Sequence, residues 1–104
     1  KNTMNNERRK QLAALIEKAT SLQGVASDLE SQATELKDEI ESIKDEEQEY
    51  LDNMPESLQS GEKGEAATAA IDEMDAAISI IDDFCTVLGD SLTEAIGSLE
   101  NAAA

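Results

Sequence analysis

With 104 residues the chain has room for one domain, and its composition differs from that of a compact globular protein. Aromatic residues make up 2% of the chain and tryptophan is absent, so the bulky side chains that fill most cores are missing. Histidine is also absent, which excludes metal sites and general bases built on imidazole. The apolar residues are mostly Leu, Ile and Ala at regular intervals, a composition typical of coiled coils and long helical bundles.

The net charge of −16 is unevenly distributed along the chain. Residues 1–27 carry five basic and two acidic side chains, a net of +3, whereas residues 28–56 carry twelve acidic and two basic ones, a net of −10. Residues 57–104 carry ten acidic and one basic side chain, a net of −9. Such a field repels nucleic acid and anionic membranes, since binding to either depends on Lys and Arg. The expected partners are a second copy of the chain or a basic host protein, with no cofactor.

Two features bear on the cellular setting. Cys85 is the only cysteine, so no intrachain disulfide can form, which favours a reducing cytoplasm. No stretch approaches the roughly 18 consecutive apolar residues that a membrane-spanning helix needs, and no signal peptide is expected. Residues 1–5 are expected to be a disordered N-terminus or a remnant of cloning.

Residues 6–52 are predicted to form one long helix, about 70 Å at 1.5 Å per residue. From Leu12 onward apolar residues alternate at spacings of three and four, the heptad pattern of a helix with one apolar seam. The a positions are Leu12, Ala19, Ala26, Ala33 and Ile40. The d positions are Leu15, Leu22, Leu29, Leu36, Ile43 and Tyr50. Small Ala at a lets helix axes approach closely, whereas a parallel two-stranded zipper prefers β-branched residues there.

Residues 65–100 are predicted to form a second helix with the same pattern, followed by a frayed tail at 101–104. Its a positions are Ile71, Ile78, Cys85, Leu92 and Leu99, and its d positions are Met74, Ile81, Leu88 and Ala95. Further apolar residues lie at g, Ala77 and Phe84, and at c, Ile80 and Val87. They widen the apolar arc to about 160°. One partner helix cannot cover such an arc, so a second must.

Residues 53–64 are predicted to form an ordered corner with Pro55 between the helices. Pro55 disfavours helical geometry at Met54 and can begin a short helical turn of its own. Ser60 is a candidate N-cap for the second helix, and Leu58 is expected to pack back on the end of the hairpin.

The predicted fold is therefore all-α, an antiparallel helical hairpin that resembles a coiled coil. The predicted contacts between the seams are Ile43 with Met74, Leu36 with Ile81, Leu29 with Leu88 and Leu22 with Ala95. The residue numbers of each pair sum to 117, so one hairpin geometry satisfies both seams.

A lone hairpin orders too many residues for the apolar area that it buries, so dimerisation into a four-helix bundle is expected. The expected oligomer interface consists of Ile78, Ile80, Ile81, Phe84, Val87 and Leu88.

No catalytic, cofactor-binding or metal-binding residue is predicted. Cys85 occupies a core a position with no basic neighbour in sequence, so a buried, inert thiol is expected. Carboxylates are abundant, and one row on the first helix consists of Asp38, Glu41, Asp45 and Glu49. A solvated helix face is the ordinary interpretation of such a row. The alternative is a mimic of duplex phosphates that occupies the basic cleft of a nucleic-acid-binding protein.

The corner carries the most specific sequence. The run Asp-Asn-Met-Pro-Glu-Ser-Leu-Gln at residues 52–59, followed by Glu-Lys-Gly-Glu at 62–65, resembles a group of small uncharacterised proteins of tailed bacteriophages and prophages. The resemblance covers residues 4–83 and includes an Asn-x-x-Arg-Arg stretch at 5–9. It implies a phage or prophage origin and a bacterial cytoplasmic setting, and it carries over no functional residue.

A motif at a corner, where sequence is otherwise free to vary, suggests contact with a partner. The candidate partner-binding residues are Asp52, Asn53, Met54, Pro55, Glu56, Leu58 and Gln59. The sequence thus predicts a non-enzymatic, acidic helical interaction protein, a phage or prophage accessory factor acting through self-association and protein binding. The alternative prediction is a DNA-mimic inhibitor of a host nucleic-acid-binding protein.

Overall fold

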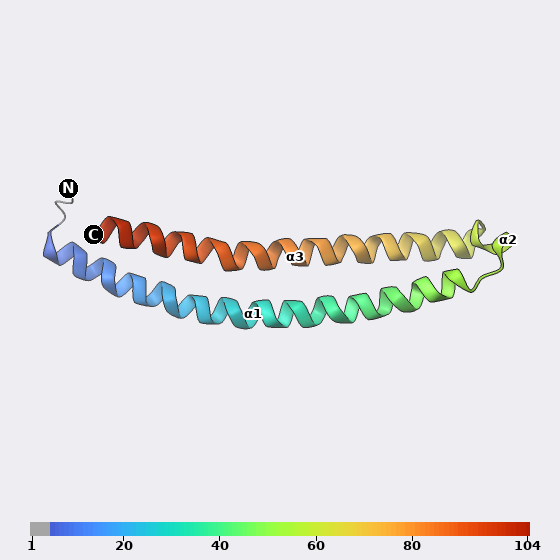
Figure 1. The fold of residues 1–104 in the computed structure, drawn as a ribbon, viewed down its shortest axis with the longest axis horizontal. Helices are drawn as coiled ribbons and strands as arrows, with labels where there is room; N and C mark the ends of the chain where they lie inside the picture. The colour runs from blue at the N-terminus through green and yellow to red at the C-terminus, as the bar shows by residue number, and fades with distance from the viewer. Residues whose placement is uncertain (1–4) are drawn as a thin grey trace. The chain divides into compact units, whose positions relative to one another are not determined.

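The computed structural model describes residues 5–104 as three helices, with no strand in that range. Helix α1 spans Asn6–Asp52, the short α2 spans Glu56–Gln59, and α3 spans Glu62–Ala103 (Figure 1). The two long helices pack together, so the predicted all-α fold is confirmed. The prediction for residues 1–4 lies outside the described residues.

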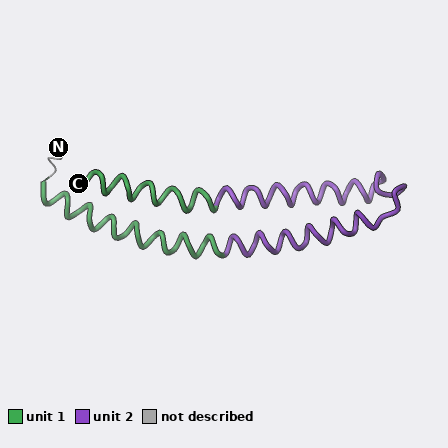
Figure 2. Tube along the Cα trace, in the orientation of Figure 1, with its two compact units in different colours: residues 1–31, 85–104 green, residues 32–84 purple. Residues whose placement is uncertain are grey.

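The chain divides into two compact units (Figure 2). The corner unit, residues 32–84, contains the end of α1, all of α2 and the start of α3, and its two long segments pack antiparallel with α2 at the turn. The terminal unit contains residues 85–104 and the chain up to residue 31, so the start of α1 packs against the end of α3. The predicted helical hairpin is therefore present within the corner unit alone.

Helix α1 has the bounds that the heptad pattern predicts. Its first turn is capped by Asn5, whose side-chain Oδ1 accepts a hydrogen bond from the backbone N–H of Arg8 at 2.9 Å. Asn is among the preferred residues at this position because it satisfies an amide that the helix leaves unpaired. The prediction of a disordered segment is thus wrong for Asn5, which serves as the N-cap.

Hydrogen bonds hold the corner in one conformation. The Pro55 carbonyl accepts from the backbone N–H groups of Leu58 at 2.8 Å and Gln59 at 3.2 Å, which forms the single turn of α2. The Gln59 side-chain amide then donates to the carbonyls of Leu51 at 3.3 Å and Met54 at 3.2 Å. Since those carbonyls belong to the end of α1 and the loop after it, this one side chain ties α2 to α1.

Helix α3 begins three residues earlier than predicted, at Glu62. The backbone N–H of Glu65 already bonds the Gly61 carbonyl at 2.9 Å, whereas Ser60 follows directly on α2 and does not cap α3. Gly64 is buried where the start of α3 crosses α2, and a Cβ there would overlap the Gln59 carbonyl. Only glycine lets the two helices approach this closely.

Helix α3 also ends later than predicted, at Ala103, so the expected frayed tail is wrong for residues 101–103. The tail is rich in alanine, which has the highest intrinsic helix propensity and continues a helix that is already formed.

The packing between α1 and α3 corrects one half of the predicted seam. On α3 the predicted a and d rows are more covered than their neighbours, apart from Ala95. On α1 the a row is covered, but the second covered row is e and not d. In the corner unit the covered residues of α1 are Ala33, Lys37, Ile40, Lys44, Glu47 and Leu51, and in the terminal unit they are Arg9, Leu12, Ile16, Ala19, Gln23 and Ala26.

The predicted register is nevertheless close to that observed. Lys37 forms an ion pair with Asp82 at 2.8 Å, and each of these residues directly follows a member of the predicted pair Leu36 and Ile81. Lys44 pairs with Asp75 at 2.7 Å, one residue beyond Ile43 and Met74. The level of the pairs was therefore predicted correctly. The rotation of α1 was not, because small Ala at a lets α3 sit over the a and e rows.

Candidate interaction surfaces

One side of the corner unit carries large apolar side chains that remain exposed. On α1 they are the d residues Leu36, Ile43 and Tyr50, and on α3 they are Ile80 and Phe84. Ile80 is the most exposed of these at 68%. We call this set the apolar face. Soluble monomers rarely expose contiguous apolar patches of this kind, and larger ones mark sites of association.

The two ion pairs show that these five residues share one side of the unit. Lys37 and Lys44 occupy e positions on α1, and Asp75 and Asp82 occupy e positions on α3. In antiparallel packing, equivalent flanks of the two helices lie on the same side. The d row of α1 and the g and c residues of α3 lie on the flank away from these ion pairs, so they project together from the other side.

The flank with the ion pairs is polar, and we call it the polar face. The hydrogen bond from each ammonium to its aspartate raises the pKa of Lys37 and Lys44 above the ordinary 10.5 of lysine. Both lysines lay their aliphatic stems along the seam and keep the charged ends at its edge.

The terminal unit repeats the same division. The d residues Leu15, Leu22 and Leu29 are exposed, as are Val25 on α1 and Val87 on α3. Its polar side carries the hydrogen bond from Gln23 Nε2 to Thr93 Oγ1 at 3.2 Å. A 160 Å³ hollow lies beside this bond, lined in part by Ala26, Glu30 and Gly89.

The predicted oligomer-interface residues divide into two groups. Ile80, Phe84 and Val87 are exposed. Ile78, Ile81 and Leu88 are half-buried and belong to the a and d rows that face α1. Sequence reasoning missed that the d row of α1 extends the exposed group. The signal that locates it is the pairing of Lys37 and Lys44 with Asp75 and Asp82, which fixes e as the flank that turns inward.

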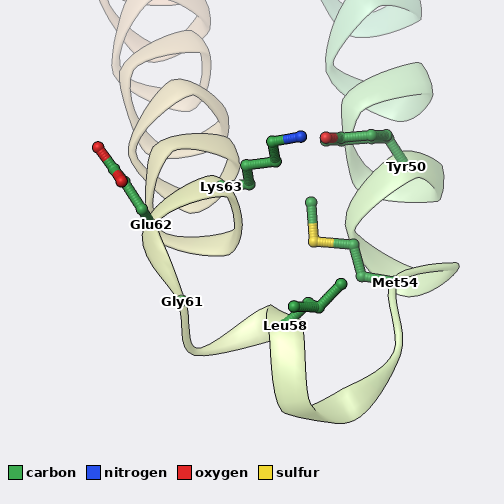
Figure 3. A pocket seen from close by; sticks show the side chains of 6 residues that line it. All are labelled: Tyr50, Met54, Leu58, Gly61, Glu62 and Lys63. Atoms are coloured by element: carbon green, nitrogen blue, oxygen red, sulfur yellow. The ribbon is translucent and has the colours of Figure 1, made fainter.

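The corner contains a cavity of 290 Å³ lined by Tyr50, Met54, Leu58, Gly61, Glu62 and Lys63 (Figure 3). The side chains of Met54 and Leu58 form its apolar floor. The Lys63 ammonium and the Tyr50 hydroxyl point toward each other across it, and the Glu62 side chain points away (Figure 3). Leu58 is exposed and so does not pack back on the hairpin as predicted. Tyr50 belongs both to this cavity and to the apolar face.

The candidate partner-binding residues of the corner have different environments. Asp52, Asn53, Pro55, Glu56 and Leu58 are exposed, whereas Met54 and Gln59 are half-buried. Gln59 spends its amide on the corner itself, as described above. The exposed members are the ones open to contact by a partner.

The acidic row of Asp38, Glu41, Asp45 and Glu49 is exposed along α1. Cys85 is a half-buried free thiol. Within residues 5–104 no group of three or more Cys, Asp or Glu residues is arranged to hold a metal ion. None of the helices described is both long and apolar enough to cross a membrane.

Comparison with protein-family models gave no match, and searches of curated proteins and of solved structures gave none either.

Proposed function

We propose that the protein is a non-enzymatic, self-associating helical module. Two copies pack through their apolar faces and the exposed rows that continue them, which forms a four-helix bundle. The acidic outer surface and the corner remain available to other proteins.

The balance of buried and exposed apolar side chains carries this proposal. In the described chain the buried hydrophobic residues are Ala26, Ala67 and Ile71. Eleven large hydrophobic residues are exposed: Leu15, Leu22, Val25, Leu29, Leu36, Ile43, Tyr50, Leu58, Ile80, Phe84 and Val87. A single copy therefore leaves in water most of the apolar surface that would stabilise it, and association with a second copy removes that surface from water.

Charge gives this association a distinctive salt dependence. Two chains that each carry −16 repel one another, and added salt screens this repulsion. The dimer should therefore tighten as the salt concentration rises.

A matched pair of double variants on α3 tests the proposal by sedimentation. Ile80→Glu/Phe84→Glu places two charges on the apolar face, whereas Ala76→Glu/Ser79→Glu places two charges on exposed positions away from it. We expect the first variant to be monomeric and the second to remain dimeric. Equal behaviour of the two variants, or a native chain that is monomeric and fully helical at micromolar concentration, would contradict the proposal.

A second proposal is that the acidic row mimics duplex phosphates toward a basic host protein. Its support is the exposure of all four carboxylates on one helix. Binding should weaken with salt, opposite to the dimer, and duplex DNA should displace the chain from its target. The variant Asp38→Asn/Glu41→Gln/Asp45→Asn/Glu49→Gln should lose the target, while neutralisation of Asp90 and Glu94 should not. Retention of the target by the quadruple variant would refute mimicry.

We also propose a phage or prophage accessory role in a bacterial cytoplasm, which the resemblance of residues 52–59 supports. Detection of the chain in a prophage-bearing host, and its level before and after prophage induction, tests this assignment.

A further inference from the structure

We infer that the two copies pack with their α1 helices antiparallel to each other, so that the basic start of each α1 lies against the acidic part of the other. This inference rests on the proposed self-association and adds the orientation and register of the second copy.

The first argument is the self-complementary spacing of the exposed d row. Its six members lie at intervals of seven residues from Leu15 to Tyr50 on the single helix α1. A two-fold axis perpendicular to α1, between Leu29 and Leu36, pairs Leu15 with Tyr50 and Leu22 with Ile43 of the second copy. This register covers every member of the row, whereas a shift of one heptad leaves one member at the end of each row without a partner.

Phe84 provides an independent argument for the same axis. Within the corner unit the ion pair between Lys37 and Asp82 fixes the level of α3 against α1. At that level Phe84 lies opposite residue 33, beside the proposed axis. An exposed aromatic ring on the apolar face then meets Phe84 of the second copy, which is the pairing that a two-fold axis requires of a residue next to it.

Charge complementarity selects the orientation. Position g lies next to the d row, and on α1 it is Lys18 near one end and Glu46 near the other, both exposed. The antiparallel register brings Lys18 of one copy beside Glu46 of the other. The cluster of Arg8, Arg9 and Lys10 likewise approaches the acidic residues around Glu56 of the second copy. Copies running in the same direction would instead place the two basic starts together and the two acidic regions together, which is unfavourable.

Cross-linking of single cysteines in the full chain tests the register, with Cys85→Ala as background. Lys18→Cys mixed with Glu46→Cys should give a cross-linked dimer with a short bifunctional maleimide. Neither variant should cross-link to itself, because the two equivalent residues would lie about 42 Å apart along the helix. Gln32→Cys, an exposed g residue beside the axis, should cross-link to itself. Thr20→Cys mixed with Gln48→Cys is the matched control, since these exposed residues have similar levels on the polar face and should give no product.

The outcomes separate the inference from the proposal on which it rests. Cross-linking of Lys18→Cys to itself, or a dimer by sedimentation in which the mixed pair gives no product, overturns the antiparallel register and leaves self-association intact. A monomer by sedimentation overturns both. The mixed product together with self-linked Gln32→Cys supports the inference.

Discussion

The seam and the apolar face of the corner unit differ in a way that residue chemistry alone would not suggest. Leu36 keeps 52% of its surface exposed, whereas the side chain of its neighbour Lys37 keeps 26%. Ile43 and Lys44 show the same reversal, at 58% and 27%. The chain packs its lysines against α3 and leaves its leucines outside. A single copy therefore completes its seam but not its apolar face, which indicates that the face is built for another copy.

The largest effect should come from breaking the face without touching the seam. Leu36→Glu introduces a charge where a leucine would be buried in each copy of the dimer. We expect the dimer dissociation constant to rise by about 100-fold, because two leucine burials are lost. Thr34→Glu, an exposed change two residues away, should leave the constant nearly unaltered. Sedimentation equilibrium measures both variants, and circular dichroism should show unchanged helix content at concentrations where the native chain is folded.

The second effect comes from breaking the corner that closes the seam. Gly64→Ala places a Cβ against the Gln59 carbonyl, so α3 must move away from α2. We expect a loss of about 2–3 kcal/mol in unfolding free energy, measured by urea denaturation at fixed protein concentration.

Gly24→Ala is the control for this change, since nothing lies within 4 Å of a Cβ at that position. It should stabilise the helix by about 0.5–1 kcal/mol. If both glycine variants are stabilising, the close approach at Gly64 is not real.

A third prediction concerns the close approach of the helices in the terminal unit. Ala26 is buried on the a row, so Ala26→Leu should force the segments apart and cost about 1–2 kcal/mol. Ala13→Leu adds the same volume at an exposed position and should be neutral. Thermal unfolding compares the two. A stable Ala26→Leu variant would mean that the a row does not face α3.

The smallest effect concerns the ion pairs at the edge of the seam. Their hydrogen bonds raise the pKa of Lys37 and Lys44 in the folded state, so folding favours the protonated lysines. This contribution is complete below pH 10.5 and is lost as the pH rises through the raised pKa values. Thermal unfolding between pH 9 and about 12 should show a small decline that is weaker in Lys37→Met/Lys44→Met. An equal decline in that variant would show that the two pairs do not contribute.

The heptad pattern was sufficient to predict the extent of α1 and the level at which it meets α3. Alternation at three and four residues specifies a helix whatever its partner, and pairs such as Leu36 with Ile81 follow from reversal at Pro55. The ends of α3 were less predictable. Ser60 has the chemistry of an N-cap, yet the turn of α2 uses that residue, and α3 begins beyond it.

The rotation of α1 was not predicted, because Leu at d looks like a seam in any sequence. The decision between d and e depends on how closely Ala33 and Ala26 allow α3 to approach, and on whether a lysine can reach an aspartate across the gap. The matched spacing of Lys37 and Lys44 with Asp75 and Asp82 does carry this information. The corner cavity had no sequence signal, since it depends on the directions of Tyr50 and Lys63.

Sedimentation equilibrium of the native chain over a range of concentrations and two salt concentrations tests the central claim most directly. We predict a mass of twice the 11.2 kDa chain at micromolar concentration, with a dissociation constant that falls as salt is added. A mass of one chain at every concentration, with full helix content, would contradict the claim that the exposed row of α1 is covered by a second copy.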